Sequence, residues 1–329
     1  MQLAVSLPVA GVGVDATVPF VRRCVEWGYS AAWSSEVAGP DFPSLLGAVA
    51  SCGVDLGVAV APVQTRSPWL LAATASTLSH LSGGRFTLGL GTSSEVIVEQ
   101  WSGIPFERPL ERLRETVEAV RAILSGQRVD LSGEFVTARG YRLFAPPPAP
   151  VPIVVGALNR RSLRQAGAIA DGVCLNQLAP EHVPLVLAEA RAGAEAAGRD
   201  PSGLLVVARL LCWVTDDVPA AREQARRTLV PYIATSVYHR FYRWLGFGEE
   251  AEAVRVALGG RDRKAATAAV SDRLLDAVTA IGDEEFVTAK VQAYVDAGVA
   301  VPVIACLCPD AVAAERTLRG IAARLRTAR

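Results

Sequence analysis

The segment LSGGRFTLGLGTSSEVIVEQWSG, residues 81–103, joins a glycine turn, a short apolar run and a loop of small residues. Gly83-Gly84 indicates the turn, because only glycine adopts left-handed backbone angles without steric cost. Residues 86–90 are too few and too apolar for a solvent-facing helix, so they indicate a buried strand. The loop at 91–94 then follows the carboxyl end of that strand, where parallel α/β proteins place their chemistry.

The same unit of a strand followed by a helix recurs along the chain. Helical periodicity is clearest over residues 107–124, where apolar residues recur at steps of three and four. We expect the strands at residues 3–7, 30–34, 55–61, 86–90, 152–155, 172–175, 204–214 and 301–306. Eight such units, linked by right-handed crossovers, close into a (β/α)8 TIM barrel. No linker rich in Gly and Ser divides the chain, so residues 1–329 are expected to form a single domain.

Two segments depart from this rhythm. Residues 129–150 alternate around Gly133 and Gly140 and end in Pro146-Pro147-Pro148, which predicts an exposed hairpin and loop. A helical insertion, which includes the charged stretch GGRDRKA, is expected between the seventh and eighth strands, over about residues 215–280.

Composition limits the classes of partner. The chain has 33 basic and 33 acidic side chains, so it has no net positive charge that would favour nucleic acid or an anionic membrane as a partner. Charges or breakers interrupt every apolar run before it reaches membrane-spanning length, and the first residues lack the basic lead of a signal peptide. Six scattered cysteines in mostly apolar surroundings favour buried thiols over a disulfide framework. We therefore expect a soluble cytoplasmic protein.

Other motifs would indicate different kinds of site, and the evidence for each of them is weaker. Gly11-Val12-Gly13-Val14-Asp15-Ala16, with Glu36 further on, fits the spacing of a dinucleotide-binding turn. However, three residues separate these glycines from the preceding strand, and that fold has about six strands rather than eight repeated units. None of the three histidines has a histidine or cysteine partner at ligand spacing, so no metal site is expected. Cys306-x-Cys308 indicates core packing.

The loop after the fifth expected strand favours a phosphate site. Small residues in Gly156-Ala157-Leu158-Asn159 let backbone N–H groups approach an anion, and a helix N-terminus follows at once. Arg160 and Arg161 are candidates for charge-assisted contacts, although arginines in such places are as often solvated. A plain loop remains the alternative.

Motifs along the whole chain resemble the luciferase-like monooxygenase superfamily, in particular its branch that uses the deazaflavin coenzyme F420. These motifs are Gly28–Trp33 leading into Glu36, Thr65–Pro68, Leu81–Phe86, Gly91–Ser94 with Val98, Glu99 and Trp101, Pro105–Leu110, Ala170–Val173 and Gly246–Glu250. Their order and spacing are specific for the superfamily. They are less specific for the cofactor, since relatives bind either F420 or flavin mononucleotide (FMN).

The resemblance implies a barrel with the tricyclic ring at the carboxyl ends of the strands. Relatives have an acid near the ring at the position of Glu36, and a bulge with a non-prolyl cis peptide behind the ring at Val60 and Ala61. The cofactor-binding positions implied here are Glu36, Val60, Ala61, Thr92, Ser93, Gly156, Ala157, Leu158 and Asn159. Glu36 is also the expected catalytic residue, either as a protonated acid or as an ionised group that only positions the cofactor.

The reaction expected from the resemblance is hydride transfer between F420 and an unsaturated carbonyl, an imine or a similar electrophile. An FMN-dependent monooxygenase and a non-redox binding protein on the same barrel are the alternatives. The expected partners are a small organic substrate and further copies of the chain, in a homodimer or higher homo-oligomer.

Two departures from the family pattern limit this expectation. Many F420-dependent relatives have histidine after the acid, where this chain has Val37, so a proton must come from elsewhere. The only lysines are Lys264 and Lys290, which argues against a sugar phosphate as the substrate. Aromatic residues near strand ends and before the insertion suggest either an apolar mouth for a bulky substrate or ordinary core. They are Trp33, Trp69, Trp101, Tyr232, Tyr238, Phe241, Tyr242 and Trp244.

Overall fold

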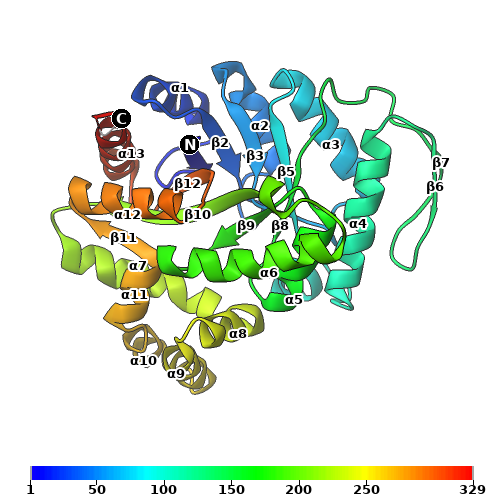
Figure 1. Ribbon diagram of the computed structural model, residues 1–329. Coiled ribbons are helices and arrows are strands. Elements are labelled where there is room, and N and C mark those ends of the chain that lie inside the picture. Colours follow the sequence, from blue (N-terminus) through cyan, green and yellow to red (C-terminus); the bar gives the residue numbers. More distant parts are fainter. Residues whose placement is uncertain (1, 328–329) are drawn as a thin grey trace.

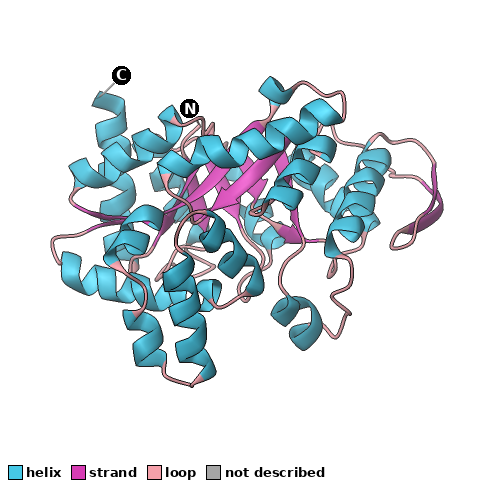
Figure 2. Ribbon diagram, turned by 60° about the horizontal axis from the view of Figure 1, so that its bottom comes forward, coloured by secondary structure: helices cyan, strands magenta, loops and turns pink. Residues whose placement is uncertain are grey.

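Parallel strands close into a barrel at the centre of the molecule (Figures 1 and 2). The computed structural model describes residues 2–327. The eight barrel strands are β1 (Ala4–Leu7), β2 (Ala31–Ser34), β3 (Asp55–Val58), β5 (Phe86–Gly91), β8 (Ile153–Gly156), β9 (Gly172–Asn176), β10 (Leu205–Val214) and β12 (Val301–Cys306). They follow one another around the barrel in chain order, and β12 pairs with β1 to close it. The (β/α)8 barrel predicted from the alternating pattern is confirmed.

The third barrel strand is interrupted where the resemblance implied a bulge. After β3 the peptide bond between Ala59 and Val60 is cis, and the short strand β4 (Ala61–Pro62) continues the pairing with β5. The expected continuous strand over 55–61 is therefore two strands with a break between them.

Helices cover the outside of the barrel (Figure 2). They are α1 (Thr17–Trp27), α2 (Phe42–Val49), α3 (Pro68–Leu81), α4 (Pro109–Leu124), α5 (Arg160–Ile169), α6 (Val183–Ala196), α7 (Val218–Ile233) and α13 (Ala311–Thr327), with short turns η1 (Ala50–Cys52), η3 (Pro180–His182) and η4 (Pro201–Gly203). Both α3 and α4 begin with proline, whose fixed φ suits a first turn. The buried face of α4, from Leu113 to Ile123, contains most of the apolar residues whose spacing predicted the helix.

The insertion before the last barrel strand is helical except at its end. It contains α8 (Ser236–Trp244), α9 (Gly248–Gly259), α10 (Arg263–Ala268) and α11 (Asp272–Val278), and α9 and α10 project from the barrel in Figure 1. The expectation of helix up to residue 280 is wrong, because β11 (Thr279–Gly282) pairs in parallel with the second half of β10. A run of four buried residues is too short to show a period in sequence. Helix α12 (Glu284–Asp296) then leads to β12.

Small and apolar side chains fill the barrel interior, and Trp33 is the largest of them. The interior cluster consists of Ala4, Ala31, Trp33, Val154, Cys174, Val207, Val301 and Val303. The indole of Trp33 lies against Gly57, where an added Cβ would come within 2.4 Å of the ring. Trp33 is therefore a core residue, and the interpretation that placed it in an apolar mouth is wrong.

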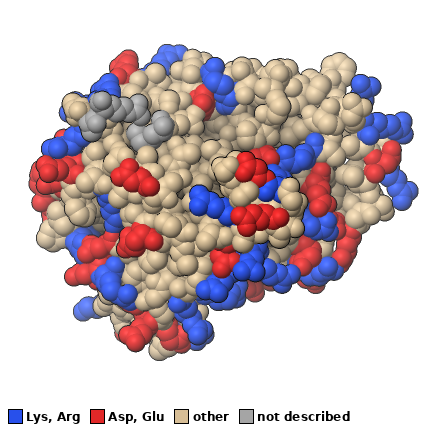
Figure 3. All heavy atoms as spheres, viewed as in Figure 1, with Lys and Arg blue, Asp and Glu red and all other residues tan. Residues whose placement is uncertain are grey.

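Acidic and basic side chains are interspersed on the face shown in Figure 3. Within residues 2–327, no helix has both the length and the apolar character needed to cross a membrane. The same residues contain no group of three or more His, Cys, Asp or Glu side chains arranged to hold a metal ion.

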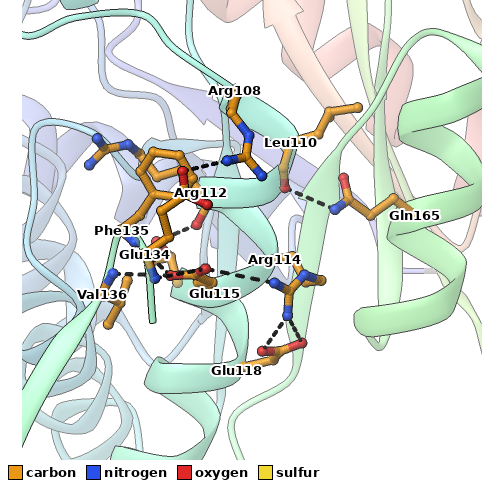
Figure 4. A network of polar contacts seen from close by, with 11 residues as sticks. Arg108, Leu110, Arg112, Arg114, Glu115, Glu118, Glu134, Phe135, Val136 and Gln165 are labelled. Carbon is orange, nitrogen blue, oxygen red and sulfur yellow. Dashed lines mark hydrogen bonds and ion pairs between the residues drawn. The ribbon is translucent and has the colours of Figure 1, made fainter. Parts of the chain in front are cut away.

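The predicted hairpin is present as β6 (Val129–Ser132) and β7 (Thr137–Tyr141), paired antiparallel at the edge of the molecule. A carboxylate on α4 holds its tip, as Figure 4 shows. Glu115 accepts hydrogen bonds from the backbone N–H groups of Phe135, at 2.8 Å, and Val136, at 3.1 Å. Burial opposes ionisation of Glu115, but these backbone donors outweigh it and lower the pKa of the carboxyl.

Replacing Glu115 with glutamine should loosen the hairpin at neutral pH, because a neutral amide oxygen accepts hydrogen bonds more weakly than a carboxylate. We expect faster hydrogen exchange at the amides of Phe135 and Val136. Because the pKa of Glu115 is lowered in the folded protein, the carboxylate stabilises the fold fully at pH values above the ordinary carboxyl pKa. This stabilisation is lost as the pH falls through the pKa of folded Glu115. The control is Glu118→Gln, since Glu118 pairs with Arg114 and not with the hairpin. Equal exchange rates in both variants would contradict this role.

Candidate active site

Glu36, directly after β2, forms a two-point ion pair with Arg66. Arg66 Nε donates to Glu36 Oε2 at 2.8 Å, and Nη2 donates to the other carboxylate oxygen. Both side chains are only 17% exposed, and the guanidinium lies over the ring of Phe42 with 5.0 Å between Cζ and the centroid. The hydrogen bond to Glu36 raises the pKa of Arg66. Because Arg66 engages both carboxylate oxygens, the geometry favours the positioning role for Glu36 over the acid role.

Val60 lies at the carboxyl end of the barrel among glycines that leave room for its side chain. An added Cβ on Gly91 would come within 2.4 Å of Val60 Cγ2, and one on Gly156 within 3.2 Å of Val60 Cγ1. An added Cβ on Gly89, one position deeper on the same face of β5, would likewise come within 3.2 Å of Val60 Cγ1. Three glycines from two neighbouring strands therefore surround Val60, and no side chain of theirs rises above its methyl groups. The methyl groups of Val60 form an apolar surface there. Its side chain is partly exposed.

Ala61, in contrast, is fully buried in the core outside the barrel and pairs with Leu90 of β5. Its side chain offers no surface to a ligand. Any contact of Ala61 with a cofactor would therefore involve its backbone, and the cofactor contacts expected for Val60 and Ala61 stay predictions.

The loop after β5 makes a sharp bend at Ser93. Ser93 has φ of 58°, in the left-handed region that non-glycine residues seldom adopt, and both Thr92 and Ser93 are half-buried. The chain then enters a π-helical turn, η2 (Val96–Trp101). Sequence reasoning placed this loop correctly at a strand end and gave no indication of the π-helix.

The loop after β8 begins helix α5, and part of its backbone is already bonded. The N–H of Ala157 donates to the carbonyl of Cys174 at 3.4 Å, and that of Asn159 to Ser162 Oγ at 3.1 Å. A capping box also engages the N–H of Ser162 with the Asn159 side chain, so the N–H groups of Arg160 and Arg161 are those left at the start of α5 for an anion.

The two arginines beside this loop bind protein groups. Arg161 donates to Glu111 at 2.8 Å, and Arg160 lies over the ring of Trp244, 5.2 Å from its centroid. The side-chain geometry of both arginines is thus explained without a phosphate.

Helix α8 of the insertion packs over the ends of β8 and β9. Asn176 Nδ2 donates to Tyr238 Oη at 2.7 Å, and Tyr242 Oη donates to Gln177 Oε1 at 2.8 Å. Desolvation by burial raises the pKa of both tyrosines. Phe241 and Tyr242 are core residues, whereas Tyr238 is partly exposed beside the barrel opening, and Trp69 and Trp101 are exposed elsewhere. The eight aromatic residues therefore do not form one continuous mouth.

Sequence reasoning missed several polar residues at strand ends. Gln64, which follows β4, is 9% exposed, and both atoms of its amide lack a partner among residues 2–327. Asn176 Oδ1 is likewise buried without a partner. Arg66 belongs to the motif Thr65–Pro68, which gives it no role, and Arg209 lies within an apolar strand. The available signal was that Asn176 directly follows a predicted strand and Arg209 interrupts one, whereas Gln64 and Arg66 lie in the loop after the third predicted strand.

Comparisons with known proteins agree with this architecture. The family model described as luciferase-like monooxygenase matches residues 3–300. A 5,10-methylenetetrahydromethanopterin reductase of Methanolobus tindarius is 30% identical over 251 residues, which cover 75% of each chain. A putative coenzyme F420-dependent oxidoreductase of Mycobacterium tuberculosis is 30% identical over 275 residues, covering 76% of this chain and 78% of that one.

Among solved structures, the coenzyme F420-dependent tetrahydromethanopterin reductase of Methanopyrus kandleri superposes with a TM-score of 0.81. The alignment covers 98% of this chain and 97% of that one at 23% identity, so it establishes the fold alone. Together, the matched family model and the relatives show that the chain belongs to the luciferase-like monooxygenase family.

Proposed function

We propose that this protein is an F420-dependent oxidoreductase acting on a small organic substrate. The observation that carries the proposal is the apolar surface at Val60. The neighbouring residues Gly91 and Gly156 have no side chains that would cover this surface. A planar ring system packs well on such a surface, because no Cβ atom holds it away. The names of relatives that are 30% identical support F420 as the cofactor.

The residues around this surface fit a tricyclic ring with a polar edge. Within the described residues, the buried amide of Gln64 has no hydrogen-bond partner for its nitrogen or its oxygen. An amide suits the alternating donors and acceptors of such a ring edge. Thr92 and Ser93 would contribute backbone groups from the bend after β5. The start of α5, after Gly156, Ala157, Leu158 and Asn159, would hold the phosphate through the N–H groups that the capping box leaves open, those of Arg160 and Arg161. Glu36 would act through Arg66 as a positioning pair.

When bound and reduced, F420 supplies a hydride to an electrophile such as an unsaturated carbonyl or an imine. The chain's own contribution is to hold ring and substrate face to face and to exclude water from the barrel mouth. Val37 carries no transferable proton, and Glu36 is engaged with Arg66, so these residues supply no acid. A proton needed by the reaction would come from the substrate or from solvent.

Titration of the purified protein with each cofactor tests the proposal. We expect F420 to bind in the micromolar range or below, seen as a change in its fluorescence, and FMN to bind at least about tenfold more weakly, a difference of about 1.4 kcal/mol. Micromolar binding of FMN without binding of F420 would identify a flavin-dependent enzyme instead. Failure to bind either would leave a non-redox binding protein. Light scattering on the same sample tests the proposed homodimer or higher homo-oligomer.

A further inference from the structure

Arg209 lies inside the barrel, on the wall opposite Val60. Along β10, Leu205 and Val207 face the interior cluster, and side chains alternate along a strand, so Arg209 is the next interior position. In the order of the strands around the barrel, β10 is four strands away from β3 in either direction. A ring resting on Val60 would therefore turn its other face toward β10.

The guanidinium of Arg209 has no partner among the residues that the structure describes. Within the described part of the chain it makes no hydrogen bond or ion pair, although the side chain is partly buried. In contrast, Arg66 at the same end of the barrel is held by a carboxylate. Leaving a cation partly out of water without an acceptor is unfavourable, so an unpaired arginine in a barrel mouth indicates a ligand that supplies the acceptor.

The polar groups near Arg209 are neutral, so they leave its charge uncompensated. Asn176 is its partner in the register with β9, and its amide carries no charge. Desolvation raises the pKa of Cys174 to about 12 and also raises the pKa of Tyr238, and the charge of Arg209 opposes both shifts. The thiol and the phenol therefore stay protonated at neutral pH, despite the neighbouring cation.

We propose that Arg209 determines substrate specificity by binding a carboxylate of the substrate on the side of the mouth that faces Val60. A guanidinium presents two parallel N–H groups that match the two oxygens of a carboxylate. This inference rests on the proposed function, because it assigns the wall beyond the cofactor ring to the substrate. It narrows the substrate class to unsaturated or otherwise electrophilic organic acids.

Matched acids and amides test the proposal through binding rather than turnover. Cinnamate and cinnamamide, and sorbate and sorbamide, would be titrated calorimetrically into the F420-loaded protein. We expect each acid to bind at least about tenfold more tightly than its amide, which corresponds to about 1.4 kcal/mol. Arg209→Gln should abolish this preference, and Arg209→Lys should keep part of it. Arg191→Gln, which removes an exposed charge on α6, should leave the preference unchanged.

Each other outcome has a definite meaning. Equal binding of acid and amide to the unaltered protein, no acid binding at millimolar concentration, or an undiminished preference in a folded Arg209→Gln variant would overturn the proposal. A parallel F420 titration of Arg209→Gln separates the two possible anions. Weakened F420 binding with the acid preference intact would assign Arg209 to the cofactor. If the unaltered protein does not bind F420, the proposed function fails, and the acid and amide titrations of the cofactor-free protein decide the role of Arg209 separately.

Discussion

Replacement of Gly156 with aspartate is expected to weaken F420 binding by at least about 100-fold, or about 2.7 kcal/mol, while the barrel stays folded. An added Cβ at this position would come within 3.2 and 3.3 Å of the two methyl carbons of Val60. The carboxylate would then extend over the surface proposed for the ring, where it brings bulk and an unpaired charge. The neighbouring methyl groups need to move by only a few tenths of an ångström, so the loss of fold stability should be small.

The matched control is Gly156→Ala, which adds the Cβ without the carboxylate and should weaken binding much less. Fluorescence titration of F420 gives the affinities, and thermal unfolding of each variant checks the fold. A folded Gly156→Asp variant with unchanged affinity would show that neither Val60 nor the start of α5 contacts the cofactor.

Replacement of Arg66 with methionine is expected to lower the free energy of unfolding, because it breaks the ion pair between Glu36 and Arg66. Arg66→Met keeps the aliphatic part of the side chain and leaves the largely buried Glu36 carboxylate without its partner. Breaking a buried pair in this way costs about 3–5 kcal/mol, and the remaining exposure of these side chains reduces the expected loss to about 2 kcal/mol. Denaturant unfolding measures it. Adding Glu36→Gln in the same chain should recover part of the loss, and no recovery would contradict a direct pairing.

Glu36→Gln alone distinguishes the two chemical roles of this residue. An ionised carboxylate has no proton to give, so the glutamine variant should retain turnover of whichever electrophile a substrate screen identifies. A loss of turnover with F420 affinity retained would instead assign Glu36 the role of the acid.

Local patterns in the sequence were sufficient to predict the barrel. The eight strand segments, the amphipathic helix over 107–124 and the hairpin after it all appear, with bounds that shift by a few residues. Each depends on periodicity, prolines or glycine turns within about a dozen neighbouring residues. The predicted position of reactive loops at strand ends followed from the fold class itself.

The composition of the site, in contrast, depended on residues far apart in the chain. Glu36 and Arg66 are 30 positions apart, and Asn176 and Tyr238 are 62 apart. The partner of a charged residue is decided by which strand ends meet, and periodicity along one segment carries no information about that. For the same reason, Trp33 could be read from sequence as part of an open mouth, although it fills the barrel against Gly57.

The sequence by itself therefore determined the fold class, the order of the elements and the loops in which chemistry is expected. Only the tertiary structure decided that Val60 is surrounded by glycines from two other strands, that Ala61 is buried, and that Arg209 lies inside the barrel without a partner among residues 2–327. Local backbone preferences set the first group, because they act between near neighbours. The second group depends on barrel closure, which brings β3 within reach of β5 and β8 and places β10 opposite to it.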